Sequence, residues 1–313
     1  MMAGMEALEF AKGHGTGNDF VIVPDPDGQR EVTPHLVAAL CDRRHGIGGD
    51  GLLRVVRVDA AGLPPQGDAE WFMDYRNADG SVAEMCGNGV RVFARYLVDS
   101  GLARPELAIA TRSGVVTASV TPEAVSVTLD APRLVGSAAA RLDGLELSGT
   151  AVDCGNPHLV CPLPAGLDLA GLDLTHPPAV DPGRFPHGVN VELTSPGPDP
   201  GTVRMRVYER GVGETRSCGS GACAVAAVTL ATGGRDSGVV TVETVGGPLT
   251  VSLADGRAVL TGPAVLVARG TVMLDALGRG ASTRPGAVSG ADRGRRSRDR
   301  QRRPRRTEDS GDR

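Results

Sequence analysis

Aromatic residues and lysine are scarce in this chain. Phe, Trp and Tyr make up 3% of its 313 residues, and Lys12 is the single lysine. The core must therefore be built mostly from Val, Leu, Ala and Ile. Enzymes that use pyridoxal phosphate need a lysine to form a Schiff base. Because Lys12 is the one candidate, chemistry without a cofactor is favoured.

Signals for membranes and disulfides are also missing. No run of eighteen apolar residues is present, which argues against a membrane span, and the N-terminus lacks the basic and apolar segments of a signal peptide. We therefore expect a cytoplasmic protein. The six cysteines have irregular spacing, so a disulfide framework is not expected. Cys218 and Cys223 form a weak C-x4-C pattern, and no metal site is predicted from it.

Positive charge is concentrated at the C-terminal end. Residues 281–313 hold eleven arginines and five acids, a net charge of +6, so the rest of the −4 chain carries −10. A segment with so few apolar residues cannot form a core, and residues 280–313 are predicted to be disordered. An RNA-binding arm is the alternative, and it would lose salt-dependent binding on truncation at Gly280. No aromatics are interleaved for base stacking, so we do not expect nucleic-acid binding.

The order of motifs is repeated along the chain. A Gly-Asn pair before an apolar strand, a His-Gly pair, a tyrosine and a cysteine occur in that order twice, with Tyr75 and Cys86 in one copy and Tyr208 and Cys218 in the other. Such a duplication predicts two pseudo-symmetric domains of an α/β, more narrowly α+β, fold. Each would have a curved, mostly antiparallel sheet or barrel around a central helix, with the active site in the cleft between them. The predicted domains are residues 1–130, completed by a strand near 264–275, and residues 131–263.

Both repeated cysteines precede a glycine loop and a helix. Residues 85–95 are MCGNGVRVFAR and residues 217–227 are SCGSGACAVAA. Unpaired backbone N–H groups and the dipole at a helix start stabilise an anion. A thiol there can have its pKa lowered from about 8.5 to roughly 3.5–7.5. Two such thiols on opposite faces of a small carboxylic acid suit inversion at carbon, with one thiolate removing a proton and the other thiol returning one.

A set of motifs is similar to one known family. The segments FAKGHGTGNDF, CDRRHGIGGDG, MDYRNADGSVAEMCGNGVR, CGNPH, GVNVE and ERGVGETRSCGSGAC, spread over roughly residues 8–275, resemble diaminopimelate epimerase. The resemblance implies the duplicated fold and a cofactor-independent isomerase. That enzyme interconverts LL- and meso-diaminopimelate in the synthesis of lysine and peptidoglycan precursors. By analogy it also implies a homodimer.

The resemblance further implies roles for individual residues. Cys86 and Cys218 match the proton-transfer cysteines, His158 and Glu209 match residues thought to tune the thiols, and Arg210 matches the clamp on the distal carboxylate, for which a guanidinium is well shaped. The substrate-binding set is Asn18, Asn77, Gly87, Asn88, Asn156, Asn190, Glu209, Arg210, Gly219 and Ser220. One departure is Gly51, where many members carry glutamine.

Less specific interpretations stay open for several of these residues. Asn77 and Asn156 lie in sequences typical of turns, and His158 could be a core histidine. Buried cysteines are usually small hydrophobes, which is the interpretation favoured for the other thiols: Cys41, Cys154, Cys161 and Cys223.

Two other enzyme classes compete with the epimerase. A proline- or hydroxyproline-type racemase with the same duplicated fold would need a smaller and more apolar pocket, without a use for Arg210. A cysteine hydrolase could use Cys218 as nucleophile with His158 or His187 as base. The hydrolase leaves Cys86 and the duplication unexplained.

Overall fold

The computed structural model describes residues 7–83 and 85–277, so the predicted disordered tail lies outside the described residues. Strands dominate, and the described part has three α-helices, of which α2 and α3 are the long ones. The helices are α1 (Pro34–Cys41), α2 (Gly87–Asp99) and α3 (Gly219–Thr232), with short 3₁₀ turns at Leu169–Gly171 and Leu274–Ala276.

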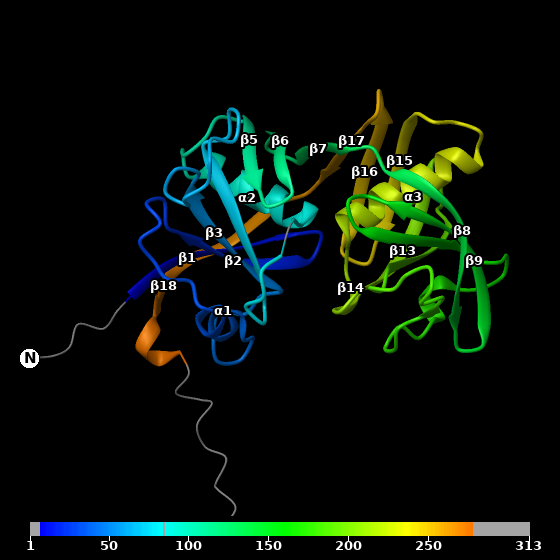
Figure 1. Ribbon diagram of the computed structural model, residues 1–313, viewed down its shortest axis with the longest axis horizontal. Helices are drawn as coiled ribbons and strands as arrows, with labels where there is room; N and C mark the ends of the chain where they lie inside the picture. The colour runs from blue at the N-terminus through cyan, green and yellow to red at the C-terminus, as the bar shows by residue number, and fades with distance from the viewer. Residues whose placement is uncertain (1–6, 84, 278–313) are drawn as a thin grey trace, which may run out of the picture. The chain divides into compact units, whose positions relative to one another are not determined.

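The strands of the first half follow one another along a single sheet (Figure 1). They are β1 (Ala7–Gly15), β2 (Asn18–Pro24), β3 (Gly51–Arg57), β4 (Trp71–Asn77), β5 (Glu106–Thr111), β6 (Gly114–Val120) and β7 (Val125–Asp130). The last strand of the chain, β18 (Val265–Met273), pairs antiparallel with β1 and so adds to this half.

The second half has the same construction. Its strands are β8 (Arg133–Leu142), β9 (Leu145–Asp153), β10 (Pro157–Pro162), β12 (Asn190–Pro196), β13 (Thr202–Glu209), β15 (Gly238–Thr244), β16 (Gly247–Ala254) and β17 (Arg257–Gly262). The short strands β11 (Ala179–Val180) and β14 (Gly213–Thr215) are added at β8 and β13.

The strand pairings reveal the duplication directly. From β1 to β7 the successive pairs are antiparallel, parallel, antiparallel, parallel, antiparallel and antiparallel. The pairs along β9, β10, β12, β13, β15, β16 and β17 have the same order. The equivalent strands β7 and β17 pair with each other and join the halves. The predicted duplicated α+β fold is therefore confirmed.

Each long helix packs inside the curve of its own sheet. Helix α2 contacts β1 to β7 and β18, and α3 contacts β9, β10, β12, β13 and β15 to β17. Because the helices are enclosed, both are buried around most of their circumference. Small apolar residues dominate α3, as expected for a helix surrounded by its sheet, whereas α2 also buries two arginines. Neither half of the sheet closes into a barrel, since no described pairing joins β7 to β18 or β17 to β8. The predicted domain boundaries stay a prediction, although the pairing of β18 with β1 supports the return of that strand.

The glycine-rich residues 13–19 form a hairpin. Strand β1 continues to Gly15 and β2 begins at Asn18. Thr16 and Gly17 connect them with φ of 48° and 77°. Two successive positive φ values are typical of a tight hairpin turn whose twist matches the strands. The turn places the buried Thr16 side chain beside the start of α2.

Candidate active site

Two cysteines cap the two enclosed helices in the same way. Cys86 precedes α2 with an extended backbone, and the Gly89 N–H donates to its Sγ at 3.4 Å. Cys218 precedes α3, and the Gly221 N–H donates to its Sγ, also at 3.4 Å. A sulfur atom thus takes the place of the usual capping oxygen. The repeated C-G-x-G motif therefore has the same cap geometry in both halves.

The two helix starts meet at their glycines. A Cβ placed on Gly219 would lie 3.3 Å from the Cα of Gly87 and 2.9 Å from Cδ2 of Leu260. Only a residue without a side chain allows this approach. Since each thiol directly precedes its glycine, Cys86 and Cys218 belong to one junction, where two sets of helix N-terminal N–H groups converge.

An asparagine from the first hairpin lies against Cys86. The Cys86 thiol donates to Asn18 Oδ1 at 3.6 Å, and Asn88 Nδ2 donates to the same oxygen at 3.3 Å. Asn18 Nδ2 in turn donates to Asp50 Oδ2 at 2.8 Å. Asp50 was not predicted as a site residue, although it lies in the quoted HGIGGDG motif. It fixes the orientation of the Asn18 amide.

Gly51 has a structural explanation. A Cβ there would lie 2.6 Å from the carbonyl oxygen of Arg76 and 2.8 Å from Cε2 of Tyr75. The position therefore has no room for a side chain in this chain, because the Tyr75 ring fills it. No glutamine contact is available at this point, and Asp50 supplies the neighbouring polar group.

Arg210 and Asn190 form a second cluster. The Arg210 backbone N–H donates to Asn190 Oδ1 at 2.9 Å, and its guanidinium donates to the carbonyl of His187 at 3.3 Å. The Arg210 side chain is exposed, and its guanidinium has no ion pair within residues 7–83 and 85–277. Such a group is suited to an incoming carboxylate.

The other two predicted asparagines have local partners. Asn77 accepts from the Tyr75 hydroxyl and donates to Ser81 Oγ, both at 3.0 Å. Asn156 Oδ1 lies 3.0 Å from Nε2 of His158. Both asparagines are half-buried. No described hydrogen bond joins either amide to a thiol.

His158 lies in a buried pair rather than against sulfur. Its Nδ1 is 2.6 Å from Oε1 of Glu192, and both side chains are fully buried. With Asn156 on the other nitrogen, no described hydrogen bond joins His158 to a thiol. Glu192 was missed by the sequence reasoning. The available signal was an acid among the apolar residues of the strand GVNVE, next to the predicted Asn190.

The thiols have raised pKa values, contrary to the prediction. Burial raises the pKa of Cys86 to about 11; the Glu209 carboxylate adds to this, while the Gly89 N–H acts in the opposite direction. Burial also raises the pKa of Cys218 well above its usual value, with Glu209 and Glu192 as further causes. The helix N-terminus does favour the thiolate, but loss of water outweighs it. Glu209 accepts a hydrogen bond from Thr215 Oγ1, and its charge raises the pKa of both thiols.

The other four cysteines are consistent with the interpretation that they are small packing residues. Cys41, Cys161 and Cys223 are buried and Cys154 is half-buried, and all are free thiols. Within the described residues no group of three or more His, Cys, Asp or Glu side chains could hold a metal. No helix of that part is long and apolar enough to span a membrane.

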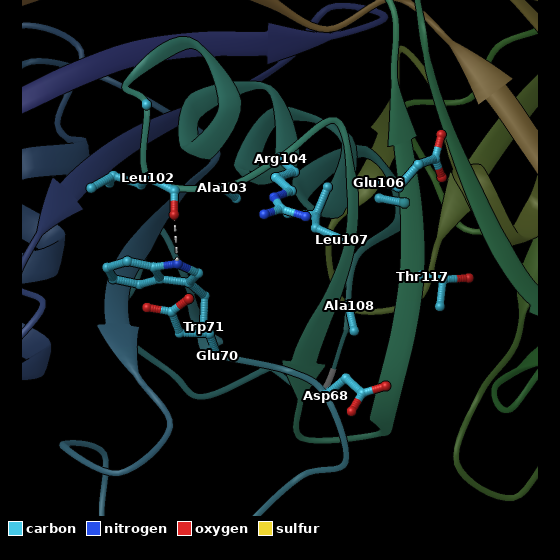
Figure 2. Close-up of a pocket in the computed structure, with 12 residues that line it drawn as sticks. Asp68, Glu70, Trp71, Leu102, Ala103, Arg104, Glu106, Leu107, Ala108 and Thr117 are labelled. Carbon is cyan, nitrogen blue, oxygen red and sulfur yellow. Dashed lines mark hydrogen bonds between the residues drawn. The ribbon is translucent and has the colours of Figure 1, made fainter.

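Two surface hollows lie away from the thiols. One of about 710 Å³ has Trp71, Leu102 and Leu107 among its lining, and the indole N–H of Trp71 donates to the Leu102 carbonyl (Figure 2). The other, about 530 Å³, is lined partly by Arg54 and Arg112. Neither includes a cysteine, so neither is the candidate active site.

Known proteins resemble this chain over most of its length. The family model described as Diaminopimelate epimerase matches residues 10–135 and 150–267. The diaminopimelate epimerase of Rhodococcus opacus is 52% identical over 282 residues, covering 85% of this chain and 97% of that protein. The one from Thermobifida fusca is 50% identical over 278 residues, covering 86% and 100%.

Solved structures share the fold at low sequence identity. A phenazine biosynthesis protein of the PhzF family from Bacillus anthracis has a TM-score of 0.64 at 19% identity, covering 86% of this chain and 99% of that one. A hydroxyproline epimerase from Agrobacterium vitis has a TM-score of 0.62 at 17% identity, covering 88% and 94%. At these identities the likeness concerns the fold alone.

The duplicated fold, its paired cysteine caps and the named relatives define an isomerase of the racemase and epimerase class. The chain belongs to the diaminopimelate epimerase family.

Proposed function

We propose that this protein interconverts LL- and meso-2,6-diaminopimelate by proton transfer at the α-carbon between Cys86 and Cys218. The observation that carries the proposal is the matched capping of two helices whose first glycines touch. The names of the relatives supply the substrate. The pathway would be the synthesis of lysine and peptidoglycan precursors.

The reaction needs a base and an acid on opposite sides of one carbon. One cysteine, as thiolate, takes the α-proton, and the other, as thiol, gives a proton to the opposite face, so the configuration inverts. The roles exchange in the reverse direction. Because the α-proton is weakly acidic, N–H donors that hold the negative charge developing next to it must lower much of the barrier. The Gly87-Asn88 and Gly219-Ser220 segments provide such donors for the α-carboxylate.

The rest of the substrate would be held by polar side chains. Arg210 would bind the distal carboxylate, and Asn18, Asn77, Asn156 and Asn190 would bind ammonium and carboxylate groups, since an amide both donates and accepts. Glu209 would adjust the charge at both thiols. His158 would act indirectly, through Asn156 and Glu192. No step requires pyridoxal phosphate or a metal.

The competing functions have weaker support. A hydrolase would need a histidine base at Cys218, but both ring nitrogens of His158 are engaged by Glu192 and Asn156. A proline-type racemase shares the fold, yet it would leave the Arg210 guanidinium without a substrate carboxylate. We further propose a cytoplasmic homodimer, by analogy with the family.

The test follows deuterium at the α-carbon. The reduced protein, without pyridoxal phosphate or metal, is incubated with LL-diaminopimelate in D₂O beside Cys86→Ala, Cys218→Ala and, as a control, Cys161→Ala. We expect deuterated meso product from the wild type and the control and none from the other two variants. If the folded wild type exchanges no α-proton, the diaminopimelate proposal is wrong, and proline-like substrates should be tried next.

A further inference from the structure

A buried arginine without an acidic partner lies one turn beyond Cys86. Arg91 is fully buried, and its guanidinium donates only to neutral oxygens in the described residues: the Gly87 carbonyl at 3.3 Å, Asn88 Oδ1 at 2.8 Å and Thr16 Oγ1 at 3.2 Å. Its Nε has no hydrogen-bond partner there. Burial lowers the pKa of Arg91 to about 10, so it is still a cation at neutral pH. A buried charge normally has an opposite charge beside it.

The groups that can supply that opposite charge are thiols. Cys86 and Cys223 are the ionisable residues that act on Arg91. Cys223 is 2% exposed and burial raises its pKa to about 12. Cys86 is half-buried, has a lower pKa of about 11, and accepts an N–H from Gly89. Of the two, Cys86 is therefore the thiol that ionises more readily beside Arg91.

Arg91 also determines how a binding residue is oriented. Because its Nη2 donates to Asn88 Oδ1, the Asn88 amide nitrogen must face the other way. That nitrogen donates to the Ser217 carbonyl at 2.9 Å and to Asn18 Oδ1 at 3.3 Å. Thr16 Oγ1, which accepts from Arg91, lies 2.7 Å from Ser217 Oγ. Ser217 directly precedes Cys218, so Arg91 is linked to the thiol loops of both halves.

We propose that Arg91 is a positioning residue for the two-thiol reaction. It provides the counter-charge for the Cys86 thiolate, and it holds Asn88 so that the two loops carrying the thiols keep their relative position. This role rests on the proposed function, in which Cys86 must be a thiolate in one direction of the epimerisation. Arg91 touches neither sulfur in a described hydrogen bond. It acts through charge and through Asn88 and Thr16.

Other groups also face Cys86 and must be considered in a titration. Glu209 from β13 raises the pKa of Cys86, and Tyr75 from β4 shares its surroundings. Burial raises the pKa of Tyr75 above its usual value, so its hydroxyl stays neutral over the range of interest. Arg91 is the cation among the groups that act on Cys86.

The experiment measures alkylation of Cys86 by iodoacetamide, quantified by peptide mass spectrometry at a fixed pH below the thiol pKa. Arg91→Gln removes the charge and Arg91→Lys retains it. A neighbouring cation shifts a pKa by about 1–3 units, and higher nucleophilicity offsets part of the loss of thiolate. We expect Arg91→Gln to slow alkylation by about three- to thirtyfold, while Arg91→Lys stays near the wild type.

Arg95 provides a matched control. It is a buried arginine one turn further along α2, where it donates to the carbonyls of Ala264 and Thr121. Arg95→Gln should leave the alkylation of Cys86 unchanged. The proposal is overturned if Arg91→Gln equals the wild type, if Arg91→Lys is as slow as Arg91→Gln, or if Arg95→Gln is equally slow.

A second measurement needs no change at Arg91. The Nε nitrogen resonance of Arg91 should move with pH as Cys86 ionises in the wild type, and should lose that movement in Cys86→Ser. Identical titration in both proteins would overturn the proposal even if Arg91→Gln does not fold. Neither measurement uses substrate, so failure of the protein to epimerise diaminopimelate is a separate result. If it does epimerise, Arg91→Lys should lower kcat more than it raises KM. Lys keeps the charge, but it lacks the planar set of donors that contacts Gly87, Asn88 and Thr16 together.

Discussion

The two halves present the same thiol in different electrostatic surroundings. Five residues after Cys86 the first half has Arg91, and five residues after Cys218 the second half has Cys223. Burial raises the pKa of both thiols, and the Glu209 carboxylate adds to this in each half. The Arg91 cation lowers the pKa of Cys86, whereas the Glu192 carboxylate raises that of Cys218 further. The fold is thus duplicated, but the charge is not. In the free protein Cys86 is therefore the more readily ionised of the two thiols, since the pKa of Cys218 is raised more strongly.

Of the changes that test this difference between the halves, removal of either thiol should have the largest effect on activity. We expect Cys86→Ser and Cys218→Ser to lower kcat by about 10²–10⁴-fold, the usual contribution of a positioned acid or base. The rates of LL to meso and meso to LL conversion should be measured for both variants. A variant that retains at least half of the wild-type rate would show that its thiol is not a proton-transfer group.

Arg210 distinguishes a substrate with two carboxylates from one with a single carboxylate. Arg210→Met should raise KM by about tenfold to a hundredfold, because a hydrogen bond to a charged group contributes about 1.5–3 kcal/mol. Steady-state kinetics on LL-diaminopimelate measure this. Arg204→Met, at an exposed arginine paired with Glu243, is the control. An unchanged KM in Arg210→Met would remove this residue from the substrate site.

The pH profile tests the raised thiol pKa values. The base must be a thiolate, and Cys86 has a pKa of about 11, so the ionised fraction grows with pH below that value. We expect kcat/KM to rise about tenfold per pH unit between roughly pH 7 and 9. A profile that is flat over this range would mean that the free enzyme holds a thiolate of much lower pKa.

Glycine substitutions at the junction should have the smallest effect of these changes. A Cβ at Gly219 would lie 2.9 Å from Leu260 Cδ2, and one at Gly87 would lie 3.3 Å from the same atom. Overpacking of this kind costs about 1–3 kcal/mol. We expect Gly219→Ala to lower the free energy of unfolding more than Gly87→Ala in urea titrations. The reverse order would show that the halves do not meet as tightly at Gly219 as described.

Local patterns in the sequence were enough to predict much of the protein. The starts of α2 and α3, the paired cysteines and the duplicated architecture follow from motifs within a few residues, because capping and helix formation are local. The acid partner of His158 and the orientation of Asn88 did not follow from such patterns. The first depends on Glu192, which meets His158 from a neighbouring strand, and the second depends on the hydrogen bond from Asn88 to Ser217 in the other half. One sequence does not reveal those pairings.

The sequence by itself determined which residues form the junction: two cysteines, each followed by a glycine that lets the helix ends touch. Only the tertiary structure decided how those thiols ionise. The helix N-terminus predicts an acidic thiol, but enclosure by the sheets removes water from Cys86 and Cys218 and raises both pKa values. Desolvation depends on everything packed around a group rather than on its neighbours in the chain.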